Sequence, residues 1–168
     1  AGRASPSLNI PCEKIEIATK GSTASFGNLS AARSYSASCS SSTRGVVGGG
    51  AEPSAVSTIE YFTMSSGGGA NDFGDLAIAR SYPAGANSST RGLFLYAYAP
   101  KTSSIEFITI PTLGNATNFG DASHTGFAKG GTSSSTRGVF IGGSNPSVTV
   151  NIIEYNEIVT EGNSVDFG

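Results

Sequence analysis

Glutamate and arginine recur along this chain at a regular spacing, and both could take part in ion-pair or ligand chemistry. A glutamate within an apolar segment occurs four times, at Glu13, Glu60, Glu106 and Glu154. The triplet Thr-Arg-Gly occurs three times and places arginines at Arg44, Arg91 and Arg137. Because a catalytic centre is normally unique, recurring charges indicate a structural role. We predict Arg–Glu pairs that tie neighbouring strands or units together; the alternative is a ring of charges that binds a ligand.

The remaining candidates for catalysis and metal binding are sparse. His124 is the one histidine and has no Cys or His neighbour in the sequence, which is a weak pattern for a metal site. The serines are not framed by the G-x-S-x-G segment of a nucleophile elbow. We therefore predict a protein that is not an enzyme and that carries no metal or cofactor.

Asn and Asp residues flank the recurring Phe-Gly pairs, and oxygen ligands of this kind also bind calcium. The residues concerned are Asn28, Asp72, Asp75, Asn118 and Asp121. Asx beside glycine is typical of tight turns, because its side chain bonds the nearby backbone. Since the carboxylates are few, we predict turns here, with a repeated calcium site as the alternative.

Tyrosines and cysteines are the other candidate functional residues. Tyr35, Tyr82, Tyr96 and Tyr98 would bind a glycan if their rings are exposed, and the alternative is packing inside a strand. Cys12 and Cys39 are the two cysteines, and they form either a disulfide or two buried free thiols.

Composition restricts the classes of partner. The chain has 168 residues, of which 13% are charged, and its formal net charge is -2, so no basic surface for nucleic acid is expected. No apolar run approaches about 18 residues, so no membrane insertion is expected. The 38% of hydrophobic residues and the 23 glycines predict many short strands joined by turns.

A tandem repeat of about 47 residues organises the whole chain. Phe-Gly pairs begin at Phe26, Phe73, Phe119 and Phe167, at steps of 47, 46 and 48 residues. The interval from each glutamate to the next such phenylalanine is always 13 residues, and only the interval from arginine to glutamate varies. We therefore predict one repeat array over residues 1–168, with units at about 12–58, 59–104 and 105–151 and a partial unit at 152–168.

Each unit is predicted to be all-β. One strand is GVVGGG, GLFLYA or GVFIGG, and another is TIEYFTM, SIEFITI or NIIEYNEIV. We expect a turn at the GNATNFGD-like segment and one or two further strands in the Ser-rich segment.

A unit of this length with a glycine doublet after an apolar strand resembles the kelch repeat. The doublets are Gly49-Gly50 and Gly142-Gly143, and the next strand carries Tyr61, Phe107 or Tyr155. The resemblance implies four-stranded blades of a β-propeller. The chain departs from the pattern because it lacks Trp and has Tyr96-Ala97 in place of one doublet. Since about 3.5 units do not close a propeller, an open β-repeat array, a longer protein and completion by other chains are the alternatives.

The segments SSSTRGVF, IEY and GNATNFGD also resemble repeats in fibre and structural proteins of tailed phages, notably those of marine cyanobacteria. This resemblance implies a non-enzymatic structural and adhesion module of an extracellular assembly, such as a phage tail-fibre, tail or decoration protein. Its expected location is extracellular or on the virion surface. Its expected partners are other copies of itself, other virion or surface proteins, and a cell-surface glycan. The alternative function is a carbohydrate-binding module of a bacterial surface protein.

Overall fold

The chain forms antiparallel β-sheets throughout the part that the structure describes. A computed structural model describes residues 12–19, 21–145 and 148–168, and these ranges contain no helix. They form three four-stranded sheets, one two-stranded sheet and a short separate hairpin. The prediction of an all-β protein is therefore confirmed.

Each four-stranded sheet is a meander, in which the strands lie side by side in the order in which they occur along the chain. Sheet I contains β3 (Ala37–Ser40), β4 (Arg44–Gly48), β7 (Thr58–Thr63) and β8 (Asn71–Asp75). Sheet II contains β9 (Ala84–Asn87), β10 (Arg91–Leu95), β11 (Ser104–Thr109) and β12 (Thr117–Asp121). Sheet III contains β13 (Gly130–Ser133), β14 (Arg137–Ile141), β15 (Ile153–Glu157) and β16 (Val165–Asp166). The N-terminal sheet contains β1 (Cys12–Lys14) and β2 (Ala24–Gly27), and the hairpin contains β5 (Ala51–Glu52) and β6 (Ser54–Ala55).

The segments of the repeat supply the four strands in a fixed order. The Ser-rich segment gives the first strand, the Thr-Arg-Gly segment the second and the glutamate segment the third. The Phe-Gly segment, which was predicted to be a turn, is the fourth strand, so that prediction was wrong. A unit counted from one glutamate strand to the next takes two strands from each of two sheets.

The Phe-Gly pair forms a β-bulge, which explains why it is a strand and why its spacing is strict. In sheet I, Ile59 faces Gly74 and Glu60 faces Asp72, so Phe73 is an extra residue without a direct cross-strand partner. The same shift occurs at Phe119 in sheet II and at Phe26 in the N-terminal sheet. The phenylalanines of sheets I and II are both buried, so the bulge places a large apolar ring in the core.

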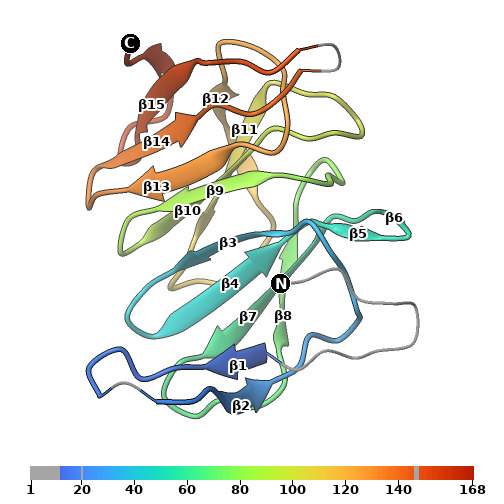
Figure 1. Ribbon diagram of the computed structural model, residues 1–168, viewed down its shortest axis with the longest axis vertical. Helices are drawn as coiled ribbons and strands as arrows, with labels where there is room; N and C mark the ends of the chain where they lie inside the picture. Colours follow the sequence, from blue (N-terminus) through green and yellow to red (C-terminus); the bar gives the residue numbers. More distant parts are fainter. Residues whose placement is uncertain (1–11, 20, 146–147) are drawn as a thin grey trace.

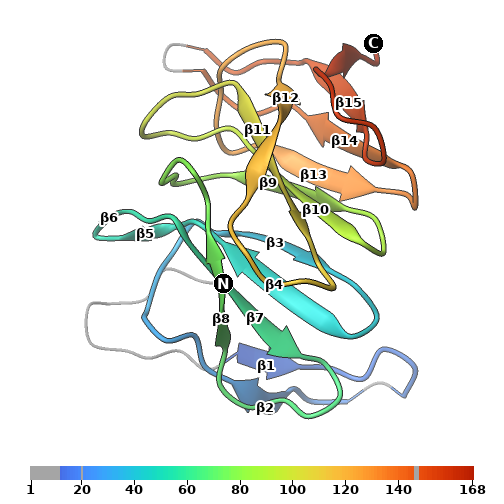
Figure 2. The same cartoon turned by 180° about the vertical axis from the view of Figure 1, so that it is seen from behind.

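The sheets follow one another along the long axis of the molecule, from the N-terminal sheet at one end to sheet III at the other (Figures 1 and 2). One apolar cluster joins sheets I and II and includes Val46, Ile59, Phe73, Phe94, Ile108 and Ile110. A second joins sheets II and III and includes Leu93, Leu95, Ile105, Phe119, Phe140 and Ile158. The core therefore lies between consecutive sheets, and each sheet depends on its neighbour to cover an apolar face.

Backbone contacts repeat from one pair of sheets to the next at the outer edge, by which we mean the side of each sheet that ends in its fourth strand. The N–H of Gly114 donates to the carbonyl of Phe73 at 2.9 Å, and the N–H of Gly162 donates to that of Phe119 at 2.8 Å. A Cβ at Gly74 would lie 2.6 Å from the backbone of Gly114, so only glycine permits this approach. The glycine of the Phe-Gly pair is thus fixed by the distance between sheets.

The backbones of neighbouring first strands also approach closely, at the opposite or inner edge of the sheets, and this contact gives a test of the packing. A Cβ added at Gly131 would lie 2.1 Å from the carbonyl oxygen of Gly85 in the preceding sheet, whereas one at Gly130 would meet its nearest neighbour at 3.9 Å. We expect Gly131→Ala to lower the free energy of unfolding by about 1–3 kcal/mol, because two backbones must separate. The neighbouring control Gly130→Ala should change it by no more than about 0.5 kcal/mol. Urea unfolding followed by circular dichroism measures both, and equal stabilities would contradict the close packing of β9 and β13.

Candidate binding site

The recurring glutamates form ion pairs, but with different cations from those predicted. Glu60 accepts a hydrogen bond from Arg33 at 2.7 Å, and Glu106 accepts one from Arg80. All four side chains are at most 3% exposed. The predicted pairing with Arg44, Arg91 and Arg137 was wrong, because each carboxylate points toward the loop that follows the preceding sheet rather than toward the strand beside it.

Backbone donors complete the coordination of each buried carboxylate. Glu60 also accepts from the N–H of Ser30 at 3.0 Å, and Glu106 accepts from the N–H of Ala77 at 2.7 Å. Glu154 of sheet III accepts from the N–H of Ser123 at 3.0 Å. A buried charge needs several such donors to offset its lost hydration. Glu13, at the equivalent position of the N-terminal sheet, is exposed.

The arginines of the Thr-Arg-Gly triplets lie at the start of the second strand of each four-stranded sheet and stack on aromatic rings. The guanidinium carbons of Arg44, Arg91 and Arg137 lie 4.7, 4.7 and 4.6 Å from the ring centroids of Tyr61, Phe107 and Tyr155. Arg44 also donates to the carbonyl of Ile110 in the next sheet at 2.6 Å, and Arg91 donates to that of Ile158 at 3.2 Å. Arg44 and Arg91 therefore link consecutive sheets through their bonds to these carbonyls, whereas each cation–π contact lies within one sheet.

Sheet III replaces the buried arginine with a lysine from another position. Gly126 stands where Arg33 and Arg80 stand in the earlier repeats, and Lys129 reaches the carboxylate instead. The Lys129 Nζ lies 3.6 Å from Glu154 Oε1 and 4.6 Å from the ring centroid of Tyr96. Burial lowers the pKa of Lys129 to about 8 and raises the pKa of Glu154. Within the described residues, neither the Lys129 Nζ nor Glu154 Oε1 has a hydrogen-bond partner.

Ser123, His124 and Glu154 lie together in this cluster but do not have the geometry of a catalytic triad. The Ser123 hydroxyl donates to Glu154 Oε2 at 2.8 Å and lies 2.9 Å from His124 Nδ1. The serine therefore bridges the histidine and the acid, whereas in a triad the histidine bridges the serine and the acid. Burial, followed by the charge of Lys129, lowers the pKa of His124. The cluster is a packed polar contact between sheets II and III.

The calcium and disulfide alternatives have simple outcomes in the structure. Asp75 accepts a hydrogen bond from Ser57 at 3.0 Å and Asp121 one from Ser103 at 3.3 Å, which are repeated contacts within the sheets. In the described ranges, no group of three His, Cys, Asp or Glu side chains is arranged as metal ligands. Cys12 and Cys39 are free thiols. Cys39 packs toward Gly92 of sheet II, away from the N-terminal sheet that holds Cys12, and burial raises its pKa to about 12.

Four aromatic rings gather on the surface where the loops before β3, β9 and β13 meet the loop between β10 and β11. We call this group the tyrosine patch; it comprises Tyr35, Tyr82, Tyr98 and Phe127. Tyr35 and Tyr82 stack with centroids 3.8 Å apart, and Tyr98 lies 4.8 Å from Phe127 in an edge-to-face contact. Tyr35 is 37% exposed and Tyr98 is 52% exposed, so the patch presents ring faces and edges to solvent.

Backbone strain accompanies the outward turn of the two stacked tyrosines. Tyr35 and Tyr82 occupy equivalent repeat positions with φ of 59° and 58°, and Ala128 has the same conformation in the third repeat with φ of 54°. A positive φ is unfavourable for a bulky side chain and is often found at functional sites. The strain turns the backbone just after the buried Arg33 and Arg80.

Tyr96 is not part of the patch. Its side chain is fully buried between sheets II and III, with the ring 5.7 Å from His124 and 6.4 Å from Phe140. The prediction that Tyr96 could bind a glycan was therefore wrong. It stands where the other repeats have the first glycine of the doublet and shares their left-handed backbone, with φ of 63°.

The sequence interpretation missed Arg33, Arg80 and Lys129 as partners of the glutamates, and Phe127 as a member of the patch. One signal could have found two of these residues. The segment Ala-Arg-Ser-Tyr occurs at 32–35 and again at 79–82, with the same spacing as the repeat. Lys129 and Phe127 have no such signal, because they stand where the third repeat departs from the other two.

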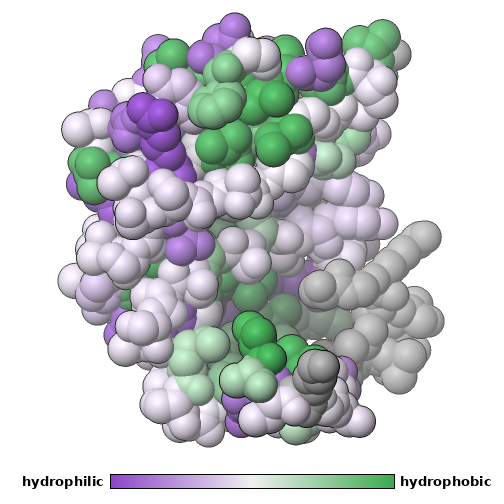
Figure 3. All heavy atoms as spheres, turned by 60° about the vertical axis from the view of Figure 1, so that its left-hand side comes forward, coloured by the Kyte–Doolittle hydropathy of each residue, from purple (hydrophilic) through white to green (hydrophobic). Residues whose placement is uncertain are grey.

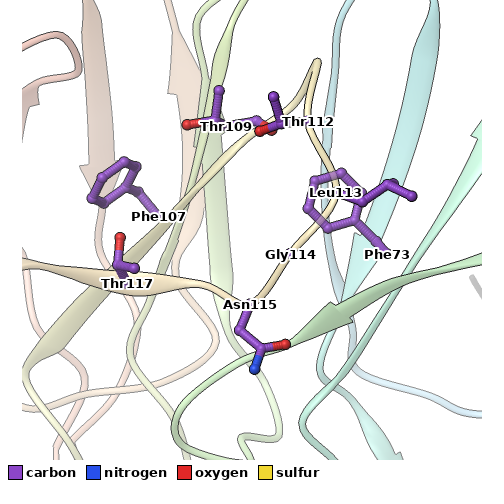
Figure 4. A pocket seen from close by; sticks show the side chains of 8 residues that line it. All are labelled: Phe73, Phe107, Thr109, Thr112, Leu113, Gly114, Asn115 and Thr117. Carbon is purple, nitrogen blue, oxygen red and sulfur yellow. The ribbon is translucent and has the colours of Figure 1, made fainter.

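A small hollow lies between sheets I and II at their outer edge (Figure 4). It has a volume of about 150 Å³ and is lined by the rings of Phe73 and Phe107 and by residues of the turn before β12. Ligand sites usually enclose about 300–1,000 Å³. The hollow is therefore too small to be the main candidate site, and the tyrosine patch is the better candidate.

Comparison with known proteins leaves the family of the chain open. The sequence matches no protein-family model and no curated protein. In the described part of the chain, no helix is long and apolar enough to cross a membrane.

The buried ion pair of sheet II gives the first test of the site's framework. We expect Arg80→Met to lower the free energy of unfolding by about 3–5 kcal/mol, because it leaves Glu106 buried without its cation. The control Arg91→Met removes a partly exposed arginine and should cost about 1–2 kcal/mol. Urea unfolding at pH 7 measures both, and a larger loss for Arg91→Met would contradict the assignment. Adding Glu106→Leu to Arg80→Met should restore part of the stability.

The buried amino group of Lys129 gives a second test. Its pKa is about 8 in the folded state and near 10.5 in the unfolded state, so the unfolded chain binds more protons between these values. Stability from this group is therefore lowest below pH 8 and rises with pH toward 10.5. The stability of the native protein minus that of Lys129→Met should increase across this interval. A difference that stays constant in urea unfolding from pH 7 to pH 10.5 would contradict the shift.

Proposed function

We propose that the chain is a non-enzymatic structural and adhesion module of an extracellular assembly, such as a phage tail fibre, and that the tyrosine patch binds a carbohydrate. The observation that carries this proposal is the patch itself, in which four rings from separate loops are held together and remain partly exposed. Exposed apolar patches on a protein surface commonly mark interaction sites.

The chemistry of the patch suits a sugar ring. Each tyrosine offers an apolar face for the C–H groups of a sugar and a hydroxyl that can donate or accept a hydrogen bond. The rings hold one another by stacking and edge contacts, so little side-chain entropy is lost when a ligand binds. The net charge of -2 and the absence of a basic cluster in the sequence disfavour a nucleic acid as the stacked ligand.

We also infer that sheets I, II and III are successive kelch-like blades of a β-propeller or of an open array of the same kind. The strand order, the glycine doublets that follow β4 and β14, and the aromatic residue on each third strand support this architecture. The first strands β3, β9 and β13 lie beside one another, as the inner strands of neighbouring blades do.

A carbohydrate-binding module of a bacterial surface protein is the second candidate, and the same patch favours it. The two differ in whether the chain also builds an assembly. Binding of a glycan by a chain that remains monomeric would favour the surface module, whereas binding together with self-association would favour the structural module.

Glycan binding is tested with the intact chain. We expect the wild-type protein to bind members of a glycan array, and Tyr98→Ala to weaken the best of these about tenfold, because one stacking face is lost. The control Leu113→Ala removes an equally exposed apolar side chain outside the patch and should leave the affinity unchanged. Isothermal titration calorimetry with the best glycan measures both variants. Failure of the wild-type protein to bind any glycan, or equal weakening by both variants, would refute the proposal.

A further inference from the structure

We propose that sheet III binds the N-terminal sheet of a second copy of this chain, head to tail, through a contact that already occurs between sheets within one chain. This inference deepens the proposed structural role by naming the partner. Its readout, self-association, is separate from glycan binding by the tyrosine patch, so either proposal can fail without the other.

The outer face of sheet III is built to be covered. Phe167 is 56% exposed, whereas its equivalents Phe73 and Phe119 are 2% and 3% exposed because the next sheet packs on them. Ile153 is likewise half-buried, although its equivalents Ile59 and Ile105 are fully buried. The ring of Phe167 still packs against Tyr155 in the edge contact that the earlier sheets show beneath their covered faces.

The opposite end of the molecule presents the matching half. Ile17 is 92% exposed, whereas Ile110 and Ile158, its equivalents in sheets II and III, are fully buried against the preceding sheet. Ile15 is 56% exposed and corresponds to Ile108, which is 2% exposed. In the space-filling view, hydrophobic residues gather near both ends of the long axis (Figure 3).

Polar groups at the two ends also match. Arg44 and Arg91 donate to the carbonyls of Ile110 and Ile158 in the next sheet, and the residue equivalent to these two in the N-terminal sheet is Ile17. Arg137 stacks on Tyr155, just as Arg44 and Arg91 stack on aromatic rings. It differs from them because it donates to Glu157 of its own sheet. In a head-to-tail pair, the guanidinium of Arg137 would therefore reach the carbonyl of Ile17.

The backbone contact at the outer edge extends the match. Gly68, Gly114 and Gly162 donate to the carbonyl of the bulged phenylalanine in the preceding sheet. Gly21 is their equivalent in the N-terminal sheet. The carbonyl of Phe167 is the acceptor that this glycine would find in a second copy. Because the two faces differ, the contact is heterologous, and it leaves one free face of each kind on every pair.

The test measures the mass of the 168-residue chain by light scattering over a range of concentrations. We expect the wild-type mass to rise with concentration, and Phe167→Asp and Ile17→Asp each to weaken association at least about tenfold. An equimolar mixture of the two variants should form a heterodimer and nothing larger, because each variant retains one intact face. The milder pair Phe167→Ser and Ile17→Ser repeats the experiment, and thermal melting checks that each variant is folded. Val148→Asp, which changes a side chain that is 59% exposed on neither face, should associate like the wild type.

Four outcomes would overturn the proposal. The wild-type chain could remain monomeric at all concentrations. Phe167→Asp could abolish association while Ile17→Asp leaves it intact, which would mean that sheet III of one chain pairs with sheet III of a second copy. Val148→Asp could weaken association as much as the face variants, or the folded variants could fail to form a heterodimer.

Discussion

The carboxylate that each third strand buries against the loop of the preceding sheet is the interaction on which the stacking depends. A charge of this kind is tolerated only when several donors reach it, and here the donors come from a cation and from the backbone of one loop. The loop after sheet I must therefore end close to sheet II, and the same holds for each junction. Once the loop is placed, the bulged phenylalanine and the glycine beside it can enter the space between sheets.

The sequence identified this framework well at the level of the repeat and poorly at the level of partners. The periodicity of Glu, Arg and Phe-Gly predicted β-sheets and a structural role for the charges, and sheets I to III follow the same strand order. It could not assign Arg80 rather than Arg91 to Glu106, because each has an equivalent arginine in the preceding repeat and each lies at an acceptable distance along the chain. Spacing does not tell which side of a sheet a residue faces when a bulge changes the alternation.

The tyrosine patch was predictable only in part for a related reason. Tyr82 and Tyr98 were identified as candidates from their type, but Tyr96 was equally plausible and is buried, because it takes a backbone position that glycine has in the other repeats. Tyr35, which repeats with Tyr82, was a candidate for the same reason. Its exposure depends on the positive φ that turns it outward, and a positive φ at tyrosine has no local sequence signature.

Function in a repeat array is best sought where the repetition breaks. The groups that recur in every unit hold the sheets together. Because they are the same in each unit, they do not mark any one unit as a binding site. Tyr98 and Phe127 interrupt the pattern. The positions equivalent to Tyr98 hold Ala51 and Ser144, and those equivalent to Phe127 hold Ser34 and Ser81. Both rings project into the space beside Tyr82, so two departures from the repeat turn a stacked pair into a patch of four rings. These two departures from the repeat lie together on the surface, which supports the proposal that the patch binds a ligand.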